Sequence, residues 1–163
     1  MSITVELTDT EVYFAAIAGV GRHLESFHKK RRDAHGLSRD DGEGICHHIL
    51  GAAGELAVAK CKGKYFSGAM NTFKTADLGE SVQVRTRSRH DWNLNVRKDD
   101  NEQHAFILVT ATIPIMVIHG WLWGHEAMKL EYLKSHGGRE EAYFVPQSRL
   151  RSIHKKKDVD VTT

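Results

Sequence analysis

Several features common in secreted and membrane proteins are missing from this sequence of 163 residues. No segment reaches the roughly 20 consecutive apolar residues that a membrane helix needs, and MSITVELTD at the start lacks the basic and apolar regions of a signal peptide. Cysteine occurs only at Cys46 and Cys61, about four turns apart in one predicted helix and too distant to form a disulfide within it. These absences predict a cytoplasmic protein with reduced, partly buried thiols and no membrane partner.

Two kinds of site are disfavoured because their characteristic spacing is also missing. Cys46 and the histidines 47, 48, 119 and 125 invite a zinc hypothesis, but none lies in a paired C-x-x-C or H-E-x-x-H arrangement. Gly19-Val20-Gly21 lies within a helical pattern and lacks the preceding strand of a nucleotide-binding phosphate loop. The sequence contains no internal repeat or linker, so we expect a single domain over residues 1–163.

The charge of the chain is balanced in total but uneven along the sequence. The formal net charge is only +2, with 40% apolar and 27% charged residues, as in ordinary globular proteins. Basic residues nevertheless form three clusters: HKKRR at 28–32, a central group at 85–98 and RLRSIHKKK at 149–157. Such clusters favour a polyanionic partner. The alternative interpretation is that they are solvated helix ends or tails, and for 28–32 alone this alternative is preferred.

The spacing of apolar residues predicts an α/β fold. Thr8 and Glu11 form a capping box at the start of the first predicted helix, whose buried stripe comprises Val12, Ala16, Val20, Leu24 and Phe27. The predicted elements are a strand at 2–7, helices at 8–35 and 43–62, a sheet core at 77–123, a helix at 125–135, and a short helix in SRLRSI within a basic tail at 149–163. We expect a central mixed sheet, built around a meander and flanked by helices, in which AFILVTA forms a strand buried on both faces.

Polar residues in the middle of the chain combine acidic oxygen ligands with a cation. Glu55 follows the small residues GAAG in the second helix, and Asp77 lies just before an alternating strand segment. Gln83 and Arg85 share one face of that segment. Hard oxygen ligands beside a cation suit metal-assisted attack on a phosphate. The alternatives are a surface carboxylate at 55, a turn residue at 77 and a solvent-exposed strand face at 83 and 85.

The order of these residues and elements resembles the PD-(D/E)XK nuclease superfamily, which has the restriction-endonuclease-like fold. In that family a helix supplies an early Glu, one strand supplies Asp, and the next strand carries (E/Q)-x-K; the matching positions are Glu55, Asp77, Gln83 and Arg85. The resemblance covers residues 43–125, and GWLWGHEA is similar to a segment of small, often phage-encoded members. It implies a deoxyribonuclease, and the dimeric state of many relatives makes a homodimer an expectation as well.

The resemblance also implies a role for each matching residue. Glu55, Asp77, the Gln83 side chain and the Val84 carbonyl oxygen would bind Mg²⁺, with Mn²⁺ as a substitute. Arg85 would hold the phosphate, and His48, two turns before Glu55, would contact substrate or transfer a proton. The candidate DNA-binding residues are Arg87, Arg89, Lys60, Arg97 and Lys98.

Two departures from the family pattern leave alternatives open. Gln83 replaces the commoner Glu and brings no negative charge, and Arg85 replaces the usual Lys and stays protonated, so it cannot act as a general base. Lys60 is a speculative substitute for that lysine. The alternatives to a nuclease are a catalytically impaired nucleic-acid-binding protein of the same fold, and a protein that regulates or inhibits another protein through its basic surfaces.

Overall fold

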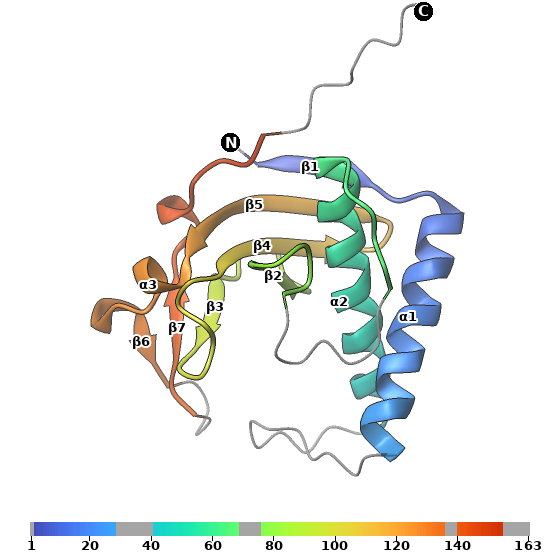
Figure 1. Ribbon diagram of the computed structural model, residues 1–163, viewed down its shortest axis with the longest axis horizontal. Helices are drawn as coiled ribbons and strands as arrows, with labels where there is room; N and C mark the ends of the chain where they lie inside the picture. The colour runs from blue at the N-terminus through green and yellow to red at the C-terminus, as the bar shows by residue number, and fades with distance from the viewer. Residues whose placement is uncertain (1, 29–40, 69–75, 136–139, 155–163) are drawn as a thin grey trace, which may run out of the picture.

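The computed structural model describes residues 2–28, 41–68, 76–135 and 140–154 (Figure 1). Its elements are β1 (Ile3–Glu6), α1 (Asp9–His28), α2 (Asp41–Lys62), β2 (Val82–Arg87), β3 (Leu94–Arg97), β4 (Ala105–Thr112), β5 (Ile115–Trp123), α3 (Gly124–Ala127), β6 (Leu133–Lys134) and β7 (Ala142–Val145). Two 3-10 turns cover Leu130–Tyr132 and Gln147–Arg149. The predicted α/β class is confirmed, as are the strands and helices expected up to residue 123, within the described ranges.

The strands form two sheets. The first has the order β1-β5-β4-β2, in which β1, β5 and β4 are antiparallel neighbours and β2 runs parallel to β4 at the edge. The second sheet is antiparallel, with the order β3-β7-β6. The predicted mixed sheet is therefore confirmed. The predicted meander is wrong, because the chain leaves the first sheet after β2, forms β3 in the second sheet, and returns through β4.

Two apolar clusters cover the opposite faces of β4. Ile107, Val109 and Ala111 belong to the cluster beneath α2, whereas Phe106 and Leu108 belong to the cluster shared with β3, β7 and α3. All residues of β4 up to Ala111 are buried. The expectation of a strand buried on both faces is therefore confirmed, and the alternation along the strand explains it.

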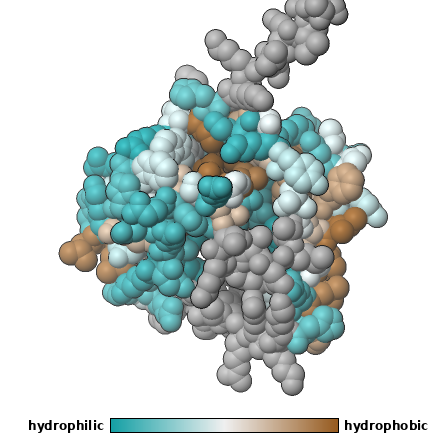
Figure 2. All heavy atoms as spheres, viewed as in Figure 1, coloured by the Kyte–Doolittle hydropathy of each residue, from teal (hydrophilic) through white to brown (hydrophobic). Residues whose placement is uncertain are grey.

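The two long helices are stacked on one side of the first sheet, with α2 between α1 and the strands (Figure 1). Close contact between the helices is possible because Gly19 lacks a side chain; a Cβ there would lie 2.4 Å from the Ile49 Cα. The buried residues of α1 are Ala15, Ala18 and Gly19. The predicted stripe is wrong for Leu24 and Phe27, which are exposed, because α1 packs through its smallest residues. Figure 2 shows apolar surface, in brown, on the side of the molecule where α1 lies.

The region after β5 differs from the prediction. The expected helix at 125–135 ends at Ala127, and Lys129 is already extended. Leu133 pairs with Tyr143 as part of β6 and β7, so strand pairing outweighs the helical spacing of this segment. Of the short helix expected in SRLRSI, only a 3-10 turn at Gln147–Arg149 forms, after Pro146; the helix does not continue, because Arg151 bridges to Trp121 of β5.

Two smaller expectations concern the thiols and the membrane. Cys46 and Cys61 are both free, as expected; Cys61 is buried, but Cys46 is exposed rather than partly buried. Within the described residues, none of the helices combines the length and apolar character needed to cross a membrane.

Candidate metal and phosphate site

Glu55 lies at the junction between α2 and the first sheet. The neighbouring Gly54 allows this approach, because a Cβ there would lie 1.9 Å from the Thr86 Oγ1 of β2. Glu55 is only 7% exposed, and its carboxylate receives two hydrogen bonds from Arg22 of α1, at 2.6 Å and 2.7 Å. The sequence correctly predicts a carboxylate where the helix packs tightly on the sheet, but it does not predict its arginine partner.

Asp77 lies beside the start of β2 and is close enough to Glu55 for their charges to interact. Its Oδ2 accepts a hydrogen bond of 2.6 Å from the backbone N–H of Val84. Burial raises the pKa of Asp77 from 3.8 to about 6, and the negative charge of Glu55 raises it further in the same direction, against the Val84 N–H, Arg85 and Arg22. Two acids on separate elements thus share one electrostatic environment.

Gln83 and Arg85 point to the other face of β2. Val84 belongs to the cluster beneath α2, whereas the Arg85 guanidinium lies over the Phe106 ring, 5.1 Å from its centroid. Arg85 donates hydrogen bonds of 2.7 Å to both oxygens of Asp100 and one of 3.3 Å to Gln83 Oε1. The predicted four-residue motif is therefore divided: the charge of Glu55 acts on Asp77, whereas Gln83 and Arg85 contact each other and Arg85 also contacts Asp100.

His48 faces α1 beside the Arg22–Glu55 pair. Its ring forms an edge contact with His23 at 5.7 Å between centroids. Burial lowers the pKa of His48, and the nearby charges of His23 and Arg22 lower it further. His48 is consequently neutral at pH 7 and has a nitrogen able to accept a proton.

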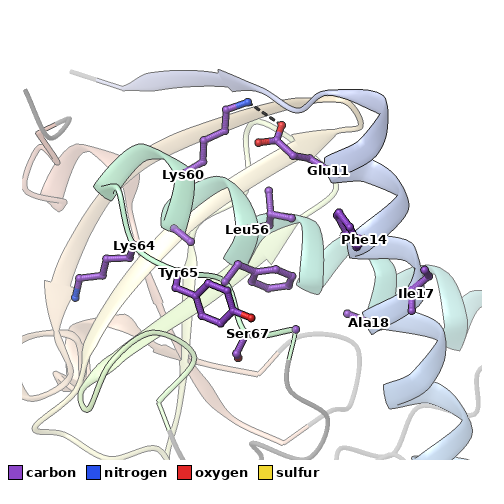
Figure 3. A pocket seen from close by; sticks show the side chains of 12 residues that line it. Glu11, Phe14, Ile17, Ala18, Leu56, Lys60, Lys64, Tyr65 and Ser67 are labelled. Atoms are coloured by element: carbon purple, nitrogen blue, oxygen red, sulfur yellow. Dashed lines mark hydrogen bonds and ion pairs between the residues drawn. The ribbon is translucent and has the colours of Figure 1, made fainter. Parts of the chain in front are cut away.

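Lys60 lies in a different environment from Glu55. Its ammonium donates hydrogen bonds to Glu11, at 2.7 Å, and to the carbonyl oxygen of Glu6, at 2.9 Å. This ion pair borders a cavity of about 580 Å³ between α1, α2 and residues 64–68, lined mainly by apolar side chains (Figure 3). Glu55 and Asp77 do not line this cavity. The structure thus gives Lys60 no position beside the acid pair.

The other candidate DNA-binding residues interact with groups of the protein itself. Arg87 lies over the Trp92 ring at 4.4 Å, Arg89 pairs with Asp91, and Lys98 pairs with Glu141. The backbone N–H of Arg97 donates to Asp100. The pairs of Arg89 and Lys98 are solvent-exposed. Exposed pairs contribute little stability, so a phosphate can replace the carboxylate at low cost.

The two outer basic clusters are described only in part. Residues 29–32 of the first cluster and 155–157 of the last cluster lie outside the described ranges. In the last cluster, Arg151 forms a bidentate ion pair with Glu126 and lies over the Trp121 ring. Among the described residues, the basic clusters thus have acidic neighbours that the linear sequence does not reveal.

Glu55 and Asp77 meet some of the requirements of a binding site for a divalent cation. In the described ranges, no three His, Cys, Asp or Glu side chains are grouped as metal ligands. Burial and then the negative charge of Glu55 nevertheless raise the pKa of the half-buried Asp77, so a cation would stabilise the charged form of this carboxylate. Mg²⁺ is commonly held by one or two carboxylates together with water. Glu55 and Asp77 therefore suit one such ion, provided that Arg22 releases an oxygen of Glu55.

Arg22, His23 and Asp100 are the site residues that the sequence does not identify. The only sequence signal for Arg22 is its position one turn after Gly19, where α1 approaches α2 most closely. Comparison of the chain with protein-family models, curated proteins and solved structures gives no match. The resemblance to the PD-(D/E)XK superfamily thus depends on the residue pattern and the order of elements in the sequence.

Proposed function

We propose that the protein is a Mg²⁺-dependent nuclease that hydrolyses DNA phosphodiester bonds and has a restriction-endonuclease-like core. The observation that carries this proposal is the pair of acids formed by the buried Glu55 and the half-buried Asp77, with the pKa of Asp77 raised to about 6. Placing two like charges together away from water is unfavourable, and such arrangements are concentrated at functional sites. The proposal includes a cytoplasmic location.

Each residue near the acid pair has a defined role in this proposal. Glu55 and Asp77 hold the ion, and the N–H of Val84 fixes the orientation of the Asp77 carboxylate. Bound Mg²⁺ would supply activation of the attacking water and neutralise the leaving oxygen. His48 accepts a proton in its neutral form, and basic residues of the central cluster hold flanking phosphates.

The second candidate function is a nucleic-acid-binding protein without cleavage activity. It is favoured by the geometry of Arg85, whose guanidinium is held by both oxygens of Asp100 and by Gln83, on the other face of β2 from α2. In this case the basic residues bind phosphates, but the residues corresponding to (E/Q)-x-K do not complete a metal site.

Cleavage assays separate the two functions. The wild-type protein is incubated with plasmid and linear DNA in Mg²⁺, Mn²⁺ or EDTA, and we expect cleavage only with the metals. Asp77→Asn should lower cleavage by roughly two to three orders of magnitude while preserving DNA binding, because it removes a metal ligand and a charge that repels phosphate. The matched control is Asp9→Asn, at an exposed position in the first turn of α1.

Two results would contradict the nuclease proposal. Cleavage by Asp77→Asn at the wild-type rate would remove Asp77 from the site. DNA binding without cleavage in any metal would favour the second candidate, provided that a gel shift weakens steeply with salt, as phosphate contacts require.

A further inference from the structure

The Arg22–Glu55 ion pair is the most completely buried ion pair described in the molecule. The side chains of Arg22 and Glu55 are 13% and 9% exposed, whereas those of the bidentate Arg151–Glu126 pair are 48% and 26% exposed. Hydrogen bonding to Glu55 raises the pKa of Arg22 despite its burial. A buried ion pair often contributes less to stability than apolar side chains of the same volume, so its presence calls for another explanation.

The guanidinium of Arg22 occupies the ligand atoms that a metal would need. Both oxygens of Glu55 accept hydrogen bonds from Arg22, and Oδ2 of Asp77 accepts one from Val84. A divalent cation bound by Glu55 and Asp77 must take at least one Glu55 oxygen from Arg22. The metal and Arg22 therefore compete for the same carboxylate.

We propose that Arg22 is a resident counter-cation with two positions: it holds Glu55 in the metal-free protein, and metal binding releases it to a phosphate oxygen of DNA. The inference rests on the proposed function, because it requires a metal at Glu55 and Asp77. The released guanidinium is suited to the second role, since its planar fork matches phosphate as well as carboxylate. Arg85 is less suited, because Asp100 remains its partner.

This arrangement links two events at the site. Without metal, Arg22 offsets the charge of Glu55 and limits the repulsion between Glu55 and Asp77. With metal, the positive charge of Arg22 becomes available at the moment when a phosphate can bind. Metal and DNA then favour each other's binding, as thermodynamic linkage requires.

Metal binding, measured by calorimetry at pH 8, tests whether Arg22 holds Glu55 in the metal-free protein. We expect Arg22→Gln to bind Mn²⁺ and Mg²⁺ roughly ten-fold or more tightly than wild type, because no hydrogen bonds to a charged partner have to be broken. Arg22→Lys keeps the positive charge but loses the bidentate hydrogen bonds. Its metal affinity should therefore lie between those of wild type and Arg22→Gln. Arg151→Gln removes a bidentate pair elsewhere and should leave the metal affinity unchanged.

The salt dependence of DNA binding tests whether the released Arg22 contacts a phosphate of DNA. A short DNA duplex is titrated with and without Ca²⁺, and the slope of log K against log salt is measured. Adding Ca²⁺ should steepen the slope more in wild type than in Arg22→Gln, by about 0.9 for the one phosphate contact that Arg22 makes. In Arg151→Gln the effect of Ca²⁺ should equal that in wild type.

The outcomes separate this inference from the nuclease proposal. If wild type binds metal and cleaves DNA but Arg22→Gln and Arg22→Lys bind metal no more tightly, the inference is overturned and the nuclease proposal stands. An equal Ca²⁺ effect on the slopes of wild type and Arg22→Gln overturns the phosphate contact. If wild type binds no metal at millimolar concentration and cleaves no DNA, both proposals fall.

Discussion

Each face of β2 has an arginine beside acidic side chains, but the charges are paired differently on the two faces. On the α2 side, Arg22 is paired with the buried Glu55, and the charges of both act on the half-buried Asp77. On the other side, Arg85 has Asp100 as a bidentate partner at the boundary of the second apolar cluster, and its side chain is 24% exposed. The first face therefore has two acids near the ion-paired Arg22, whereas on the second face Arg85 and Asp100 pair one to one.

This difference separates a candidate reactive site from a structural ion pair. A carboxylate with a single dedicated arginine is neutralised. Asp77 instead receives only the longer-range charges of Arg85 and Arg22, which do not outweigh its burial and the charge of Glu55, so another cation can stabilise its charged form further. The face with Glu55 and Asp77 is therefore the place where a metal would gain most. Substitutions on the two faces should consequently differ in size, in pH dependence and in their response to metal.

The largest expected effect is on stability and comes from Glu55→Gln. Arg22 remains buried and charged but loses the charge of its partner, so we expect the free energy of unfolding to fall by about 3 kcal/mol or more. Urea unfolding in EDTA measures this change. Glu126→Gln also removes the charge of a bidentate arginine partner, but at an exposed site, and should change stability little. If both variants lost the same free energy of unfolding, the burial of the Arg22–Glu55 pair would not change its contribution to stability.

The next prediction concerns pH. The pKa of Asp77 is raised by burial and by Glu55, from 3.8 to about 6. The folded protein then binds this proton more tightly than the unfolded chain, so the free energy of unfolding decreases as pH rises through this interval. The decrease amounts to at most about 3 kcal/mol. Asp77→Asn removes it, and the variant should therefore gain stability relative to wild type between about pH 4 and pH 6.

Urea unfolding in EDTA across this pH range provides the measurement, with Asp91→Asn as the control. The pKa of Asp91 is lowered by its hydrogen bonds with Arg89, so this carboxylate contributes stability that is lost as pH falls. Because this loss occurs below about pH 3.8, the difference between Asp91→Asn and wild type should stay nearly constant between about pH 4 and pH 6. A flat difference between Asp77→Asn and wild type would mean that neither burial nor the charge of Glu55 raises the pKa of Asp77.

A steric prediction tests how closely the acid-bearing helix approaches the sheet. In Gly54→Ala the new Cβ would lie 1.9 Å from Thr86 Oγ1, and we expect a loss of about 1–3 kcal/mol despite the higher helix propensity of alanine. Gly51→Ala is the matched control in the same helix, with no neighbouring atom within 4 Å, and should gain up to about 1 kcal/mol. Thermal or urea unfolding distinguishes the two. A neutral Gly54→Ala would show that α2 can move away from β2.

Local sequence patterns predicted one half of the candidate site better than the other. The small residues before Glu55 indicated close packing, and the alternation after Asp77 placed Gln83 and Arg85 on one face of a strand; both expectations agree with the structure. The same alternation also places that face away from Val84 and α2, which the motif order alone does not show. A motif fixes the sequence of residues, but the register and the covering helix decide which side chains meet.

The remaining features depend on contacts between distant segments. Arg22 meets Glu55 across 33 positions because two helices pack through Gly19, and nothing local in either helix specifies that pairing. The segment at 130–134 has helical spacing, yet Leu133 forms a strand because β7 offers a partner. Tertiary pairing outweighs weak local preference in such segments.

The smallest expected effect belongs to the second face. Arg85→Lys keeps the charge but loses the fork held by both oxygens of Asp100 and the stacking on Phe106, so we expect a loss of about 1 kcal/mol. Cleavage should be retained or raised, because lysine is the residue that the PD-(D/E)XK pattern has at this position. Urea unfolding and plasmid cleavage, measured on the same preparation, separate the two effects. If Arg85→Lys unfolds like wild type but no longer cleaves DNA, the guanidinium of Arg85 acts on the phosphate, and the reactive site extends across both faces of β2.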